Sequence, residues 1–167
     1  NRAYSYQRKG MNGFSNSVLS YSNSGATSLF TNITDLSKWV MNFYKPVAGD
    51  LQDIQQLTQK GKLNNGKELN YANGIVVDKY KGWIQYSHGG SDAGYRTFLL
   101  VFPELKTGFI QVSNLGDFDL NKVFKLADMF IKDTSQLNKI LQKQKMDSSG
   151  AVLKDSVSIK KYLGNYI

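Results

Sequence analysis

The chain has 167 residues, of which 41% are hydrophobic and 13% aromatic, so it can bury one sizeable core and we expect a single folded domain. Its 21 Lys and Arg residues against 13 Asp and Glu residues give a net charge of +8, but the basic residues are scattered and we expect no nucleic-acid binding. Cysteine is absent and His88 is the only histidine, which excludes disulfides, thiolate ligands and a multi-histidine zinc site. We expect no metal and no cofactor.

The start of the chain reads as the interior of a longer protein, because it lacks both an initiator Met and an apolar signal region. No stretch approaches the ~18 consecutive apolar residues that a membrane span requires, so no span is expected. Residues 1–25 are rich in Ser, Asn, Gly and Tyr without helical periodicity. They predict a surface loop with short extended pieces.

Two helices are predicted next. The first begins with Thr31 as N-cap and Asp35 in the first turn, ends before Pro46, and carries one apolar stripe made of Ile33, Leu36, Trp39, Val40 and Phe43. The second spans residues 51–58, with Leu51, Ile54 and Leu57 at a spacing of three. The run Asn64-Asn65-Gly66-Lys67 then predicts a turn that closes a small hairpin.

Four aromatic or β-branched runs predict strands at residues 74–77, 83–86, 97–102 and 109–112. They are separated by Lys81-Gly82, Gly89-Gly90, Gly94 and Lys106-Thr107-Gly108, and such short connections imply antiparallel neighbours. Asp117 or Asp119 could cap a final helix, which would cover the sheet with one apolar face made of Val123, Phe124, Ala127, Phe130 and Ile131. The fold class is therefore α/β of the α+β type, an antiparallel sheet with flanking helices.

An ordered set of motifs runs through this region. The run from Gly25 to Trp39 contains the first predicted helix, the run from Leu63 to Gly74 leads into the sheet, the run from His88 to Thr97 follows, and then come Val101-Phe102-Pro103-Glu104 and Val112-Ser113-Asn114. Taken together they resemble the serine β-lactamase-like family, which includes class C β-lactamases, penicillin-binding D-alanyl-D-alanine carboxypeptidases, D-aminopeptidases and related esterases. The resemblance covers roughly residues 20–132. It implies that residues 1–132 are the C-terminal portion of such a domain.

The remainder of the chain is assigned by pattern. Residues 133–160 are expected to be a helix extension and linker, with Ser148-Ser149-Gly150 inside it. Residues 161–167 resume an aromatic, strand-like pattern and resemble the start of a small β-rich appendage that some relatives carry.

Members of this family use three motifs in chain order: Ser-x-x-Lys with the nucleophile, Tyr-x-Asn, and a Lys-Thr-Gly or His-x-Gly strand that lines the cleft. By resemblance, His88-Gly89-Gly90 is the third motif, which puts the first two before Asn1. Four literal matches compete: Tyr21-Ser22-Asn23, Tyr71-Ala72-Asn73, Lys106-Thr107-Gly108 and Ser158-Ile159-Lys160-Lys161. We interpret all four as coincidental, the third as a hairpin turn and both Tyr-x-Asn matches as packing or loop positions.

The resemblance assigns roles to four residues. His88, expected at a strand end, would assist protonation or bind a substrate carboxylate, and the backbone N–H of Ser91 would stabilise an oxyanion. Gly89 and Gly90 would let a substrate backbone lie close to the strand. Without the resemblance, a lone histidine is more often a structural residue. Asp92, Tyr95 and Arg96 are expected in the following loop, with no assigned role.

The function implied is that of a serine acyl-transfer hydrolase acting on β-lactam, D-amino-acid peptide or ester bonds through an acyl-enzyme, with this chain inactive alone. The alternative is a non-catalytic cell-wall-binding or regulatory pseudoenzyme, which a Ser-x-x-Lys at a helix start upstream would exclude. The expected partner is a small-molecule or peptide substrate, and self-association is expected because a sheet edge would be uncovered. Relatives are mostly exported bacterial proteins, which implies a periplasmic or extracellular location.

Overall fold

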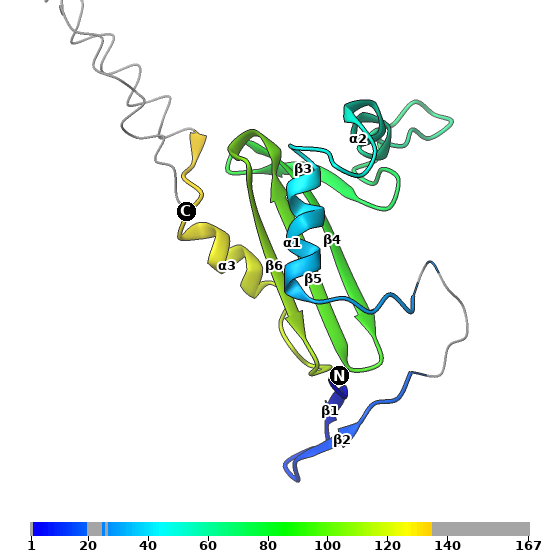
Figure 1. Ribbon diagram of the computed structural model, residues 1–167, viewed down its shortest axis with the longest axis vertical. Coiled ribbons are helices and arrows are strands. Elements are labelled where there is room, and N and C mark those ends of the chain that lie inside the picture. Colours follow the sequence, from blue (N-terminus) through cyan, green and yellow to red (C-terminus); the bar gives the residue numbers. More distant parts are fainter. Residues whose placement is uncertain (1, 20–24, 26, 135–167) are drawn as a thin grey trace, which may run out of the picture.

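The core of the molecule is a four-stranded antiparallel sheet, seen in a computed structural model that describes residues 2–19, 25 and 27–134. The strands lie in the order β3 (Val76–Tyr80), β4 (Trp83–Asp92), β5 (Tyr95–Phe102) and β6 (Thr107–Ser113), which is also their order along the chain (Figure 1). Helices flank this sheet, so the predicted α+β class is confirmed.

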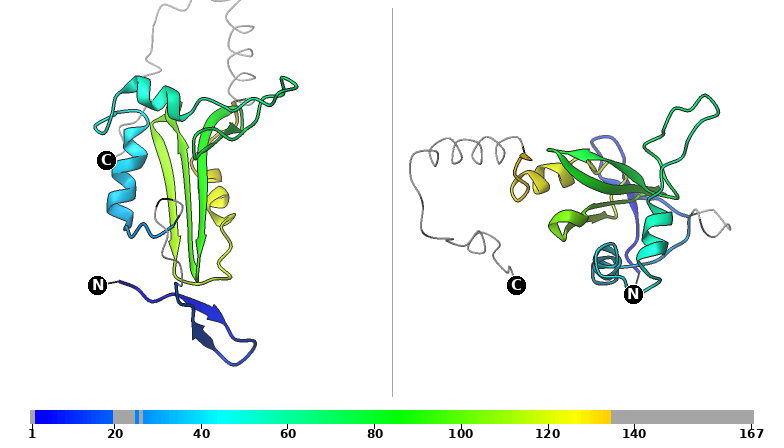
Figure 2. Two further views of the ribbon diagram at one scale, coloured as in Figure 1. Left: turned by 90° about the vertical axis from the view of Figure 1, so that its right-hand side faces the viewer. Right: turned by 90° about the horizontal axis from the view of Figure 1, so that it is seen from above.

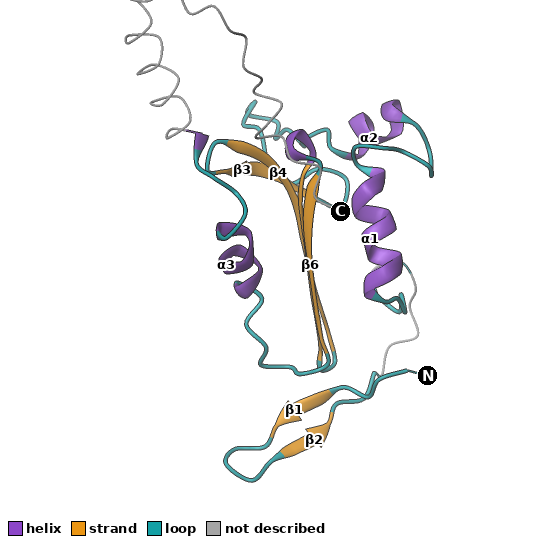
Figure 3. Cartoon of the chain, turned by 60° about the vertical axis from the view of Figure 1, so that its left-hand side comes forward, coloured by secondary structure: helices purple, strands orange, loops and turns teal. Residues whose placement is uncertain are grey.

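Two helices cover the opposite faces of the sheet. Helix α1 (Ile33–Asn42) lies on one face and α3 (Lys122–Asp128) on the other, and Figure 3 shows the sheet nearly edge-on between them. Because side chains alternate along β5, Leu99 and Val101 pack toward α1, whereas Leu100 and Phe102 pack toward α3. The sheet is thus buried on both faces near β5. The two clusters contain the residues Val40, Phe43, Ile54, Ile75, Leu99 and Val101, and Leu100, Phe102, Phe109, Val123, Ala127 and Ile131.

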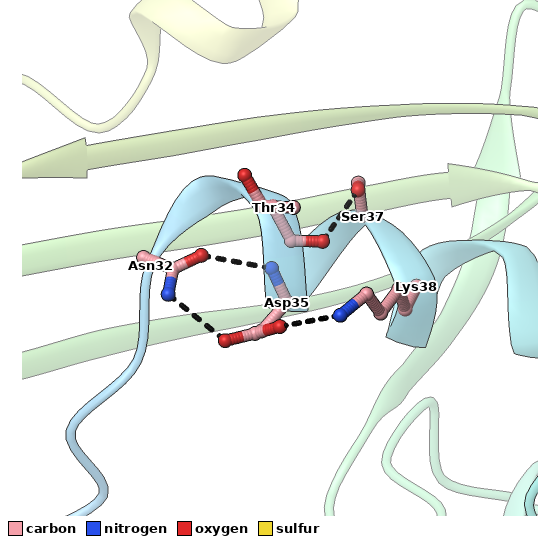
Figure 4. Close-up of polar contacts among 5 residues, drawn as sticks. All are labelled: Asn32, Thr34, Asp35, Ser37 and Lys38. Carbon is pink, nitrogen blue, oxygen red and sulfur yellow. Dashed lines mark hydrogen bonds and ion pairs between the residues drawn. The ribbon is translucent and has the colours of Figure 1, made fainter.

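The N-terminus of α1 differs from the predicted one by a single residue. Asn32, and not Thr31, is the N-cap, because its side chain accepts a hydrogen bond of 2.9 Å from the backbone N–H of Asp35 (Figure 4). Asp35 also accepts from Asn32 and from Lys38, and the Lys38 hydrogen bond holds the pKa of this carboxyl below its usual value. Of the predicted apolar stripe, Val40 and Phe43 are buried, whereas Ile33 and Trp39 are exposed.

Helix α2 (Leu51–Leu57) forms where predicted. Asp50 is its N-cap and makes a capping box with Asp53, in which each side chain accepts a backbone N–H of the other residue. Only Ile54 of this helix is buried. The turn predicted around Gly66, which has a φ of 86°, closes a small hairpin held by the isolated bridge between Lys62 and Glu68.

The prediction that Lys106-Thr107-Gly108 forms a hairpin turn is only partly right. The reversal is made by the 3₁₀ helix η1 (Pro103–Leu105) and by Lys106, which has a φ of 49°, whereas Thr107 and Gly108 already belong to β6. A Cβ at position 108 would collide with the Cγ1 atom of Val40 on α1. Gly108 is therefore required for the close approach of α1 to the sheet.

The observed strand boundaries differ from the predicted ones in two other places. The predicted strand at residues 74–77 is shifted, because β3 begins at Val76. Asp92, Tyr95 and Arg96 were predicted in a loop, but they belong to β4 and β5, which are joined by only Ala93 and Gly94. Cross-strand hydrogen bonding to β5 sustains the strand through residues with weak strand propensity.

Helix α3 is attached to the β3–β4 hairpin by polar contacts around Asp128. This carboxylate accepts from the Tyr80 hydroxyl and forms an ion pair with Lys81, both at 2.6 Å, and the Lys81 hydrogen bond lowers its pKa. Burial, followed by the Asp128 contact, raises the pKa of Tyr80 to about 12. Neither predicted cap is used: the N-cap is Asn121, whose side chain makes no capping hydrogen bond, and Asp119 accepts the Asn121 backbone N–H.

The N-terminal segment forms the predicted short extended pieces, β1 (Tyr6–Arg8) and β2 (Phe14–Asn16), which pair as a hairpin at one end of the sheet (Figure 2). Tyr6 donates its N–H to Asn114 and accepts from Gly116, both at 2.8 Å, while Arg8 pairs with Asp117. A Cβ on Gly94 would lie 2.5 Å from the Tyr6 carbonyl oxygen. The absence of a side chain at position 94 therefore lets this segment dock.

In residues 2–19, 25 and 27–134, no helix is long and apolar enough to cross a membrane. The predicted linker and appendage, beyond Thr134, lie outside the described residues.

Candidate functional site

The candidate site lies where β4 extends beyond the end of its neighbour β3. The last pair between these strands is Val76 with Ser87, whereas β4 stays paired with β5 as far as Asp92. Residues 88–92 therefore border β5 on one side and have no strand of the four-stranded sheet on the other. His88 was predicted at a strand end, which is wrong: it lies inside β4, at the point where the β3 side of the strand becomes open.

The direction of each backbone group along this open edge follows from the register. The two-residue turn Lys81-Gly82, with φ values of 52° and 85°, makes Tyr80 and Trp83 a hydrogen-bonded pair. Backbone groups alternate along a strand, so the odd-numbered residues of β4 point toward β3 and the even-numbered ones toward β5. The pairing with β5 contains no bulge to change this alternation. Gly89 and Ser91 thus direct their N–H and C=O groups out of the open edge.

His88 has a partner that the sequence did not reveal. The hydroxyl of Tyr71 lies 3.0 Å from His88 Nε2, and the two rings are tilted by 53° at a centroid distance of 6.0 Å. Tyr71 reaches this point because residues 70–72 fold back along the outer side of β3, where Val77 donates to Asn70. Its side chain is 47% exposed, so of the two predicted alternatives, packing or loop, Tyr71 takes the loop position.

The residues of the Tyr71-Ala72-Asn73 match have separate surroundings. Asn73 donates its side-chain amide to the Gln56 carbonyl at 2.8 Å, and its backbone N–H to Leu57, which ties the segment to α2. Asn73 is thus a structural residue, and α2 indirectly holds Tyr71 next to His88. The remaining two literal matches, Tyr21-Ser22-Asn23 and Ser158-Ile159-Lys160-Lys161, lie outside the described residues.

The two glycines of the motif have different neighbours on β5. A Cβ at Gly90 would lie 3.2 Å from the Thr97 hydroxyl oxygen, on the same face of the sheet as His88. A Cβ at Gly89 would make an ordinary contact of 3.5 Å with the Phe98 ring, on the opposite face. The Thr97 side chain therefore partly fills the space that a side chain at position 90 would occupy. Together with the exposed Ser91, the exposed Gly89 leaves the strand edge accessible.

Of the residues that follow, Arg96 is used internally, since its guanidinium donates to the carbonyls of Ala93 and Tyr95. Asp92 differs: its Oδ1 atom is buried and has no hydrogen-bond partner among the described residues. Buried acceptors are normally satisfied, so this carboxylate lacks the donor such an environment calls for.

Within residues 2–19, 25 and 27–134, no group of three His, Cys, Asp or Glu side chains could hold a metal ion. An open hollow of about 360 Å³ is lined by Tyr6, Phe14, Asn114 and Leu115 at the N-terminal hairpin. None of these four residues belongs to the His88 region, and because such an open, apolar hollow offers little chemistry, the β4 edge is the stronger candidate.

The fold and the site together define an α+β protein with an accessible strand edge that carries a Tyr–His pair. Comparison with protein-family models, with curated proteins and with solved structures found no match to this chain.

The orientation of the β4 backbone predicts an alternating pattern of amide exchange. The N–H groups of His88 and Gly90 bond to β5 and should exchange slowly, whereas those of Gly89 and Ser91 face the open edge and should exchange fast. Hydrogen–deuterium exchange followed residue by residue by NMR measures this difference. Equal protection of all four amides would mean that the edge is covered.

Proposed function

We propose that this chain is the C-terminal share of a serine acyl-transfer hydrolase of the β-lactamase and penicillin-binding class. The observation that carries the proposal is the open edge of β4 at residues 88–92, where the His-Gly-Gly motif lies beside outward-facing backbone groups. An extended substrate can pair with such an edge as an added strand, since main-chain hydrogen bonds supply affinity there.

The chemical roles follow from the groups at this edge. A serine supplied from outside the described residues would attack the scissile carbonyl and form an acyl-enzyme, which water then resolves. The outward N–H of Ser91 would donate to the oxyanion that develops during attack. His88 would donate a proton or bind a substrate carboxylate, and Gly89 and Gly90 would admit the substrate backbone beside the strand.

The pseudoenzyme alternative uses the same edge for binding and differs only in the absence of a nucleophile. The Ser-x-x-Lys match at Ser158 lies after every other motif, so a Ser-x-x-Lys at a helix start upstream of Asn1 would exclude this alternative. Under either version, the proposed ligand is a β-lactam, a D-amino-acid peptide or an ester, and the proposed location is periplasmic or extracellular.

The proposal predicts that the purified chain does not turn over substrate, because half of the machinery is missing. Hydrolysis of nitrocefin and of p-nitrophenyl esters should equal that of a His88→Ala variant. Turnover by the wild-type chain that His88→Ala abolishes would contradict it, because the chain would then contain its own nucleophile.

We also propose that two copies of the chain associate through β6. The outer edge of this strand exposes the backbone groups of Gly108, Ile110 and Val112, since the odd-numbered residues bond to β5. The strand has no charged residue and no Pro, the usual protection against edge pairing, so two copies can pair without like-charge repulsion despite the +8 net charge. By contrast, Asn70 already occupies the outer edge of β3.

Light scattering at high concentration tests the association. A dimer is expected for the wild type and a monomer for Val112→Lys, because Val112 is 45% exposed and can accept the charge without core disruption. A monomeric wild-type chain would overturn the pairing.

A further inference from the structure

The Tyr71–His88 contact has a chemical consequence for the two imidazole nitrogens. The only hydrogen bond of the His88 ring among the described residues is the one between Nε2 and the Tyr71 hydroxyl. Nδ1 has no partner there. Since a neutral imidazole has one donor and one acceptor nitrogen, whatever holds Nε2 decides which proton state Nδ1 presents.

We infer that Tyr71 is a positioning residue for His88: it donates to Nε2 of the neutral ring and thereby leaves Nδ1–H as the group that meets a ligand. This inference deepens the proposed function and rests on it, because it names which nitrogen acts at the β4 edge. A tyrosine hydroxyl suits the task because it can donate to a neutral ring and accept from a charged one. The contact is therefore kept in both protonation states of the imidazole.

The surroundings of the pair favour positioning over packing. Tyr71 is 47% exposed, and it belongs to neither buried core cluster. The segment that carries it is nevertheless held at several points, by the bridge between Tyr71 and Val76 and by the hydrogen bonds of Asn73 to α2. An exposed side chain whose backbone is fixed in this way is directed at its partner without adding to the core.

His88 is the only histidine of the chain, so the imidazole signals in an NMR spectrum need no assignment by mutation. A long-range ¹H–¹⁵N spectrum recorded at about pH 9, well above the pKa of an ordinary imidazole, distinguishes the protonated from the unprotonated nitrogen. For the wild-type chain we expect the proton on Nδ1 and an acceptor shift at Nε2. A wild-type ring protonated on Nε2 would overturn the inference without the need for any variant.

The variant Tyr71→Phe removes only the hydroxyl and should move the population toward the Nε2–H tautomer. Tyr86→Phe is the matched control, because Tyr86 lies two residues before His88 on the same face of β4 and its hydroxyl has no hydrogen bond among the described residues. It should leave both ¹⁵N shifts of the ring in place. Identical tautomer populations in the wild type and Tyr71→Phe would contradict the positioning role. The readout requires no turnover and no ligand, so failure here is distinct from failure of the proposed hydrolase.

Discussion

Gly108→Ala is expected to lower the free energy of unfolding by about 1–3 kcal/mol, the usual cost of inserting a methyl group into a packed contact. The new Cβ would meet Val40 Cγ1 on α1 and would lie 3.3 Å from the Leu100 carbonyl oxygen. Gly108 does not have a positive φ, so backbone strain does not contribute and the collision alone carries the effect. Urea denaturation followed by circular dichroism measures the loss.

A double-mutant cycle with Val40→Ala isolates this collision. Val40→Ala removes the colliding methyl group, so the double variant should be less destabilised than the sum of the two single variants. Additive losses would mean that Gly108 does not set the distance between α1 and β6.

Phe102→Ala is expected to cost about 3–5 kcal/mol, which is a large share of the ~5–15 kcal/mol by which an ordinary domain is stable. The Phe102 side chain is fully buried. Its ring centroid lies 6.1 Å from that of Tyr80 and 6.2 Å from that of Phe109, so Phe102 links β3, β5 and β6 on the α3 face. Removal leaves a cavity that these neighbours cannot fill without moving strands. Thermal denaturation by calorimetry gives the change.

Phe14 provides the matched control, since it is the same residue type in the N-terminal hairpin and is 57% exposed. Phe14→Ala should change stability by no more than about 0.5 kcal/mol. Comparable losses of stability for Phe102→Ala and Phe14→Ala would contradict the placement of the hydrophobic core around β5.

The sequence predicted those elements whose signals are local. Helix α2 and the turn at Gly66 depend on neighbours within a few positions, and both formed as expected. The burial of Val40 and Phe43 followed from helical spacing. Thr31 and Asn32 are both favourable N-cap residues, so the sequence alone does not distinguish them, and only the backbone geometry places the cap at Asn32.

Features that depend on distant residues were missed. Gly89-Gly90 was expected to end a strand, but pairing with Thr97 and Phe98 keeps β4 extended to Asp92. The Tyr71–His88 contact joins residues 17 positions apart, through a loop whose path is set by α2. The parallel bridge between Tyr6 and Leu115 is more distant still. No periodicity or spacing in the sequence encodes such pairings, because they arise only when the sheet has formed.

In the proposed function, the open edge of β4 at residues 88–91 forms one wall of a site for a β-lactam, a D-amino-acid peptide or an ester. The most direct test is a ¹H–¹⁵N titration of the chain with N-acetyl-D-alanyl-D-alanine, up to the solubility limit of the peptide. We predict saturable shifts centred on the amides of Gly89 and Ser91 and on the His88 ring, with weaker shifts at Gly90, whose N–H faces β5. Saturable shifts centred elsewhere on the chain, or no shift at this edge, would contradict the account.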